Sequence, residues 1–369
     1  MNGTPLINNK ETCARLFYLD VSRVIAIAAV VSNHALSRSF AIWNNTYEAY
    51  LNAGWARTLI KGIIYVCSRL GVPLFLMVTG ALFLERNFED KKVLNRFLKH
   101  NWLTLFKTTE IWLFTMYWLL QTIDGSVLKI QGLSKACIKC IETMLFINQI
   151  TMSSMWYMPM ILCVYLMLPV ISVSLKRIGN KYMLMLCVLV VVTGMVIPNA
   201  NVALNALGTG KYITLSYERF FSYYLVYIII GYWISKQKLE TISDRIVLLL
   251  FCVSVFFTGL FQFWTFTTPI DYVIQYADVG VLISSVFLFE LIRRYTPKLY
   301  RFKRTIRRLS ELSFGIYLLH MCFMEIITRK STLNGMSKFF YLFVISFFGS
   351  VIVIELTPKR IRSLLFRCR

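Results

Sequence analysis

The amino-acid sequence predicts an all-α membrane protein, a polytopic bundle of about ten transmembrane helices. Composition is the first reason: 57% of the 369 residues are hydrophobic and only 16% are charged, whereas a soluble domain has about 25% charged residues. The second reason is that the apolar residues form runs of roughly twenty, the length of a helix that crosses a bilayer. We expect helices because a helix satisfies its own backbone groups in hydrocarbon and no alternating strand pattern is visible.

Ten segments have this character, and we treat the whole chain, 1–369, as one integral membrane domain. They cover residues 17–37, 59–84, 102–121, 155–175, 182–198, 218–235, 245–264, 274–292, 310–328 and 339–356. The N-terminal stretch is polar and no small-residue cleavage site follows the first segment, so we interpret that segment as a retained signal anchor. The longest loop, 122–154, is modestly amphipathic around 133–147, a pattern typical of an interfacial or a re-entrant helix.

The basic residues orient these segments. They are concentrated on one side of the bundle, above all in residues 85–100, 293–308 and 359–369. The positive-inside rule places this side in the cytoplasm, and an even number of spans then puts both termini there. The net charge of +22 comes from these basic residues beside the spans. We therefore expect membrane lipids as partners and no nucleic acid.

The first segment carries the strongest candidates for a site. Asp20, Arg23 and His34 lie in it, and ionisable side chains at membrane depth are a functional signal. Arg23 and His34 are eleven residues apart, so a helix returns to the same face within roughly 20° and separates them by about 16 Å along its axis. The pattern predicts one helix face with a cation toward the cytoplasm and an imidazole toward the outside. The alternative for Asp20 and Arg23 is a charge pair at the membrane interface.

Two later segments and the start of a third carry polar or aromatic candidates. In the second segment, a Gly-Val-Pro phrase leads to Thr79 and Gly80, small residues that allow a neighbour or a ligand to approach closely. Trp156 opens the fourth segment. Tyr317 and His320, in the ninth segment, are three residues apart and therefore share a helix face. Helix packing and an interfacial aromatic belt are the alternative explanations.

The basic stretch 85–100 is the candidate for phosphate binding. It contains Lys91, Lys92 and Arg96, and arginine can bind phosphate through two parallel hydrogen bonds. Topology signalling also explains its charge. The sequence contains no GxSxG, Walker, dinucleotide-binding or HExxH motif, so it does not support a serine hydrolase, a nucleotide hydrolase or a zinc protease. We expect no metal site.

Together these motifs resemble the membrane-bound acyltransferase family 3, a group of bacterial inner-membrane O-acyltransferases. The family opens with an Asp, an Arg three residues later and a His eleven beyond that, which is the pattern of Asp20, Arg23 and His34. The second-span phrase, the basic loop, the aromatic start of a later span and a late Ser-Phe-Gly-Ile-Tyr-x-x-His phrase also match. The resemblance runs from residue 18 to about residue 355.

The sequence departs from the family pattern in two places. Thr79 stands where the family usually has a serine. Lys91, Lys92 and Arg96 stand where members often have a tighter arginine cluster. Some members carry an extracytoplasmic hydrolase-like domain after the last span; we expect none here, and the sequence resembles the single-domain kind.

The resemblance implies an enzyme of the cell inner membrane that moves an acyl group, usually acetyl, from cytoplasmic acyl-CoA to a hydroxyl at the outer face. The acceptor would be a surface polysaccharide, such as the O-antigen of lipopolysaccharide, or its lipid-linked precursor. Acyl-CoA would be a substrate, with no bound cofactor. The rival interpretations are an acyltransferase for a small molecule or a lipid, and a lipid-linked-sugar transporter without chemistry.

The resemblance also implies roles for the candidate residues. His34 would act as the general base on the acceptor hydroxyl, and Arg23 would hold the donor or bias the site electrostatically. Residues Lys91, Lys92 and Arg96 would bind the donor. The residues expected to support the site are Asp20, Thr79, Trp156, Tyr317 and His320.

Overall fold

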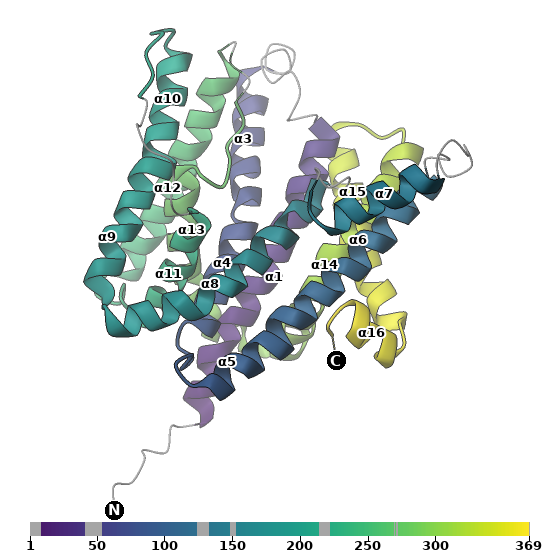
Figure 1. Ribbon diagram of the computed structural model, residues 1–369. Helices are drawn as coiled ribbons and strands as arrows, with labels where there is room; N and C mark the ends of the chain where they lie inside the picture. Colours follow the sequence, from purple (N-terminus) through teal and green to yellow (C-terminus); the bar gives the residue numbers. More distant parts are fainter. Residues whose placement is uncertain are drawn as a thin grey trace, which may run out of the picture.

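The structure is a computed structural model of an all-helical bundle (Figure 1). It describes residues 9–40, 54–123, 133–147, 153–213, 222–268, 270 and 272–368. All regular secondary structure in these ranges is helical. The helical membrane bundle predicted from the composition is therefore confirmed.

The first half of the chain forms helices α1 to α8. They are α1 (Asn9–Phe40), α3 (Trp55–Arg69), α4 (Gly71–Phe83), α5 (Lys91–Phe97), a π-helical turn at Leu98–Trp102, α6 (Leu103–Ile123), α7 (Leu133–Met144), a 3-10 turn at Ser153–Trp156 and α8 (Tyr157–Arg177). The amphipathic stretch predicted around 133–147 is thus helical in α7. The remainder of the loop 122–154 lies partly outside the described residues.

The second half of the chain completes the bundle. Its helices are α9 (Asn180–Val191), a π-helical turn at Val192–Val196, α10 (Ile197–Ala206), α11 (Tyr224–Ser235), α12 (Asp244–Phe266), α13 (Val279–Tyr295), a 3-10 helix at Thr296–Phe302, α14 (Lys303–Lys330), α15 (Gly335–Leu356) and α16 (Lys359–Leu365).

Seven stretches of the described chain are long and apolar enough to cross a membrane. One of them, Val279–Thr328, contains both α13 and α14, and a shorter apolar helix covers Tyr224–Ser235. Each of the ten segments predicted from the sequence overlaps one or more of the helices given above. Membrane crossing by α6 and α11 stays a prediction.

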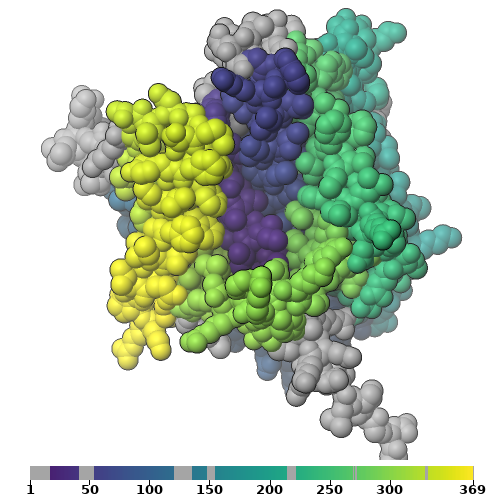
Figure 2. Space-filling view, turned by 180° about the vertical axis from the view of Figure 1, so that it is seen from behind, coloured from purple at the N-terminus to yellow at the C-terminus, as the bar shows by residue number. Residues whose placement is uncertain are grey.

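Helix α1 lies at the centre and packs against α3, α4, α13, α14 and α15. Figure 2 shows it recessed between α15 and α3. The second predicted segment is two helices, because α3 ends at Arg69 and α4 begins at Gly71, just before a proline that donates no backbone hydrogen bond. A Cβ at Gly71 would lie 2.7 Å from the backbone oxygen of Ala26, so glycine allows α4 to cross α1 closely.

The two ends of the bundle differ as the charge pattern predicts. The start of α1, α5 and the C-terminal end of the chain lie toward one end, while α7, α10 and the start of α15 lie toward the other (Figure 1). The first end carries the basic stretches of the sequence. Its assignment to the cytoplasm stays a prediction, and we call it the cytoplasmic end below.

Candidate active site

A cavity of about 380 Å³ lies beside α1 and is lined from α4, α6, α8 and α14 as well. Arg23 and His34 both line it. Because α1 is continuous from Asn9 to Phe40, the two side chains are separated by about 16 Å along the helix axis. The geometry therefore places the two polar groups that the sequence singled out on one cavity, which we call the inner cavity.

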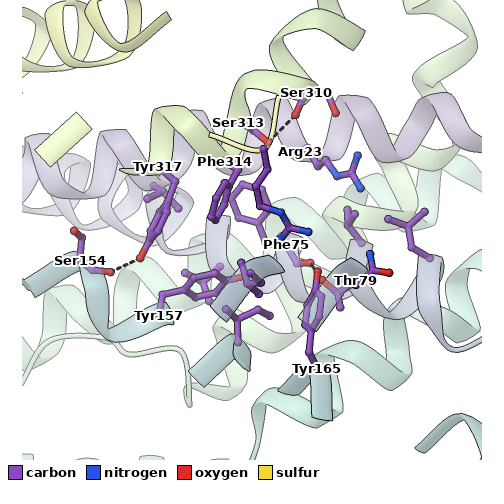
Figure 3. Close-up of a pocket in the computed structure, with 18 of the residues that line it drawn as sticks. Arg23, Phe75, Thr79, Ser154, Tyr157, Tyr165, Ser310, Ser313, Phe314 and Tyr317 are labelled. Carbon is purple, nitrogen blue, oxygen red and sulfur yellow. Dashed lines mark hydrogen bonds between the residues drawn. The ribbon is translucent and has the colours of Figure 1, made fainter. Parts of the chain in front are cut away.

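Aromatic side chains form much of the inner cavity wall. Phe75 comes from α4, Tyr157 and Tyr165 come from α8, and Phe314 and Tyr317 come from α14. Figure 3 shows these rings around the cavity, with Arg23 directed toward it. The wall of the inner cavity is thus largely aromatic, and a cation lies at its cytoplasmic end.

Thr79 and Trp156 also line the inner cavity. The Thr79 hydroxyl donates to the backbone oxygen of Phe75 at 2.9 Å, the bond by which threonine is satisfied inside a helix. The Trp156 ring stacks at 6.0 Å from Tyr224 and lies 5.6 Å from Tyr276. Both residues therefore shape the wall.

Asp20 is positioned as a link between helices. Its Oδ1 accepts a hydrogen bond from Ser310 of α14 at 2.7 Å and lies 3.7 Å from the Arg23 guanidinium. Arg307 approaches its other oxygen at 3.9 Å. The Asp20 carboxylate therefore fixes α1 against α14 and orients Arg23 at the cavity.

His34 faces a second histidine, His320, with the two ring centroids 5.3 Å apart. The His320 side chain is fully buried, and its Nδ1 lies 2.6 Å from the backbone oxygen of Tyr317. A carbonyl oxygen only accepts, so Nδ1 carries the proton and Nε2 is a bare acceptor. Within the described part of the chain, this Nε2 has no hydrogen-bond partner. A buried acceptor therefore lies beside the His34 ring.

Tyr317 holds this arrangement in place. Its hydroxyl donates to the backbone oxygen of Ser154 at 2.6 Å, the dashed contact in Figure 3. Its ring also packs 5.6 Å from Tyr157. The structure thus brings Tyr317 and His320 to the same site as His34.

A second cavity, of about 440 Å³, adjoins the first on the side away from Arg23. Its lining residues are Asn33, His34, Arg69, Trp156, Tyr223, Tyr224, Gln275 and Tyr276. His34, Trp156 and Tyr276 line both cavities. We call the second one the outer cavity, and His34 lies at the junction of the two.

Arg69 is a site residue that the sequence reasoning missed. Its side chain is 4% exposed, and its guanidinium carbon lies 4.9 Å from both the Tyr65 and the Tyr276 ring. The guanidinium also donates to the Tyr65 hydroxyl. The signal was available, because an arginine inside a predicted span is a functional hint by itself.

The predicted donor-binding residues lie elsewhere. Lys91, Lys92 and Arg96 are exposed on α5 and are not among the residues that line either cavity. Helix α5 begins at a cap in which Asp90 accepts from the backbone N–H of Lys92 at 2.7 Å. The arginines that do line the inner cavity are Arg23 and Arg367. A donor-binding role for the α5 residues stays a prediction.

The fold and the site define an integral membrane protein whose central histidine lies between two cavities. The family model described as an acyltransferase domain matches residues 16–355. The chain therefore belongs to acyltransferase family 3 and is a membrane acyltransferase, as the motifs predicted. Searches of curated proteins and of solved structures gave no match.

Proposed function

We propose that the protein transfers an acetyl group from cytoplasmic acetyl-CoA to a hydroxyl of a surface polysaccharide, such as O-antigen, or of its lipid-linked precursor. The bacterial inner membrane would be its location. The observation that carries the proposal is the position of His34 at the junction of two cavities. One cavity would receive the donor from the cytoplasm, and the other would receive the acceptor from outside.

The length of the inner cavity supports a coenzyme A donor. The pantetheine arm has roughly thirteen bonds between sulfur and the first phosphorus, and an extended chain advances about 1.2 Å per bond, which gives about 16 Å. Arg23 and His34 are separated by about 16 Å along α1. Phosphates bound near Arg23 would therefore place the thioester close to His34.

The chemistry follows from this placement. The neutral His34 imidazole accepts the proton of the acceptor hydroxyl as that oxygen attacks the thioester carbonyl. The tetrahedral intermediate collapses, the C–S bond breaks, and the imidazolium returns its proton to the departing thiolate. A positioned general base contributes about 10²–10⁴-fold in rate. These bond-forming and bond-breaking steps need no metal and no redox step.

The outer cavity supports a sugar acceptor. Its rings, Tyr223, Tyr224 and Trp156, present apolar faces, and the amides of Asn33 and Gln275 offer both donors and acceptors. Ligand pockets combine an apolar lining with a few placed polar groups of this kind. A sugar ring has the matching surface, with C–H faces and a rim of hydroxyls.

The test compares His34→Ala with His100→Ala, because His100 is exposed and lies outside both cavities. We expect wild type and His100→Ala to add the mass of one acetyl group to the surface glycan, and His34→Ala to abolish this gain. An unchanged glycan, with acetyl found instead on a small molecule or a lipid, would favour that rival acceptor. Movement of a lipid-linked sugar without any requirement for acetyl-CoA would favour the transporter. Near-normal acetyl transfer by His34→Ala would rule out His34 as the general base.

A further inference from the structure

The C-terminal tail folds back beneath the bundle. Helix α16 follows α15 after a turn at Pro358, and the tail lies near α6 and α14 (Figure 1). Three side chains fasten it: Trp112 donates to the backbone oxygen of Leu365 at 2.7 Å, Arg362 pairs with Glu355 at 2.7 Å, and Cys368 donates to the backbone oxygen of Glu311 at 3.0 Å. The tail is therefore part of the folded domain.

The last residues of the tail are buried although they lie outside every apolar span. Phe366 is 3% exposed and Cys368 is 2% exposed. The Phe366 ring packs 5.6 Å from Trp112, and its Cβ lies so close to α14 that a Cβ on Gly315 would approach it to 3.2 Å. These contacts fix the chain on both sides of Arg367.

Arg367 has a backbone φ of +55°, in the left-handed region that residues other than glycine rarely adopt. Such a conformation persists where the surrounding contacts impose it, and it is common at functional sites. Arg367 lines the inner cavity, with its guanidinium carbon 5.9 Å from the Phe314 ring.

The Arg367 guanidinium is a cation at the cytoplasmic end of a cavity. Burial lowers its pKa, but an arginine side chain remains charged at neutral pH. Among the described residues, no carboxylate forms an ion pair with Arg367, and the nearby cavity residue Glu311 pairs with Arg308 at 2.9 Å. Arg23 lines the same cavity. Two guanidinium groups thus face a space open to an anion.

We propose that Arg367 binds a phosphate group of the acyl-CoA donor, so that the C-terminal tail completes the donor site. The proposal rests on the proposed function, because it assigns the donor to the inner cavity. A guanidinium matches two phosphate oxygens at once, and either the diphosphate or the 3′-phosphate of coenzyme A offers them. Arg367 is a binding residue here, whereas His34 carries the chemistry.

The experiment measures Arg367→Gln, Arg367→Lys and the control Arg360→Gln, since Arg360 is exposed on α16 and lies outside both cavities. Each is assayed with acetyl-CoA, acetyl-dephospho-CoA and acetyl-pantetheine. We expect Arg367→Gln to raise KM for acetyl-CoA by about tenfold or more, the loss of a charge-assisted hydrogen bond, with kcat little changed. Arg367→Lys should fall between wild type and Arg367→Gln. The KM for acetyl-pantetheine should be unchanged.

The dephospho substrate separates the two phosphates. A penalty that disappears with acetyl-dephospho-CoA assigns Arg367 to the 3′-phosphate, and one that persists assigns it to the diphosphate. If Arg367→Gln and the control Arg360→Gln had the same KM for acetyl-CoA, the proposal would be overturned. An equal loss with acetyl-pantetheine would also overturn it, because the tail would then act only through the fold.

Direct binding separates this proposal from the proposed function. Calorimetry of coenzyme A with the detergent-solubilised full chain needs no acceptor. Weaker binding by Arg367→Gln than by Arg360→Gln supports the phosphate contact even if the acceptor assignment fails. Equal binding by the two variants overturns the contact even if acetyl transfer stands. Failure of the wild type to bind coenzyme A would overturn the donor assignment and this proposal together.

Discussion

The imidazole pair decides how His34 can act. An imidazole works as a base only if the proton is held on the ring nitrogen that faces away from the substrate. The Nδ1–H of His320 donates to the Tyr317 carbonyl, so its Nε2 can accept a hydrogen bond from a neighbour. The two rings are 5.3 Å apart and this Nε2 has no hydrogen-bond partner among the described residues, so we expect it to accept from the His34 ring when that ring turns toward it, which would set the tautomer of His34.

The first prediction concerns this pair. His320→Asn keeps a donor near the Tyr317 carbonyl but removes the Nε2 acceptor, so kcat should fall about 10–100-fold, the range found for partners that orient metal-bound imidazoles. His320→Gln places an acceptor near the lost Nε2 and should retain more activity. Steady-state kinetics with His100→Asn as the control checks this. Equal kcat values for His320→Asn and wild type would contradict the role.

The second prediction concerns Arg69, which lines only the outer cavity. Arg69→Gln should raise KM for the acceptor by about tenfold or more, because a charged hydrogen-bond donor is lost from that cavity. The KM for acetyl-CoA should stay unchanged. Arg69→Lys should not restore acceptor binding, since lysine lacks the planar group that stacks between Tyr65 and Tyr276.

The control for Arg69 is Arg57→Gln, an exposed arginine on the same helix. Its KM values should match those of the wild type. A rise in the acetyl-CoA KM of Arg69→Gln, without a rise in the acceptor KM, would move Arg69 to the donor side of the site.

The sequence predicted only some of these site residues. The relation between Arg23 and His34 could be predicted because it depends only on the helical repeat over eleven residues. The positions of Arg69 and Arg367 depend on which helices pack together, and no local pattern reports that. Charge density and the family resemblance both favoured Lys91, Lys92 and Arg96 as donor-binding residues, and this role stays a prediction, because charge density reports topology as well as binding.

At the scale of elements, the contact between α4 and α11 fixes the inner cavity wall. A Cβ on Gly80 would overlap the backbone of Ile228, and a Cβ on Gly231 would overlap the backbone of Met77. Each helix therefore presents a glycine to the backbone of the other, the small-residue packing typical of membrane helices. The Thr79–Gly80 phrase predicted a close approach, and the structure identifies α11 as the neighbour.

The third prediction follows from this contact. Gly80→Ala should destabilise the protein by about 1–3 kcal/mol, the usual cost of overpacking, because neither backbone can yield without moving a helix. Thermal unfolding in detergent measures the change. Gly194→Ala is the control, since its nearest neighbour is a side-chain carbon at 4.0 Å. Equal melting temperatures for the two variants would show that α4 and α11 are not held at this distance.

At this scale the positions of the helices were predictable, but the break between α3 and α4 and the docking of α16 were not. Runs of apolar residues report membrane length directly, so each predicted segment falls on a helix. The break at Leu70 depends on Pro73 and on the crossing with α1, and the docking of α16 depends on Trp112, which is distant from it in sequence. Long-range contacts of this kind leave no periodic signal.

At the scale of the whole molecule, the two cavities adjoin at His34, and the proposed function requires them to form a route through the bundle. The inner cavity reaches Arg23 and Arg367 at the cytoplasmic end, and the outer cavity reaches Tyr223 and Gln275 in the segments that precede α11 and α13. Only at His34, Trp156 and Tyr276 do their linings coincide. This arrangement would let the donor and the acceptor meet without either crossing the membrane.

The fourth prediction tests that route. In sealed inside-out vesicles, acetyl-CoA added to the bath should acetylate an acceptor enclosed in the lumen, while the free thiol of coenzyme A appears in the bath. The reason is that the acyl group alone passes the junction at His34, and the large, charged donor stays on the side of Arg23 and Arg367. His34→Ala vesicles provide the blank, and vesicles opened with detergent give the total activity. Acetylation only when acceptor and acetyl-CoA share one compartment would contradict a through-membrane site and would place both substrates in a single cavity.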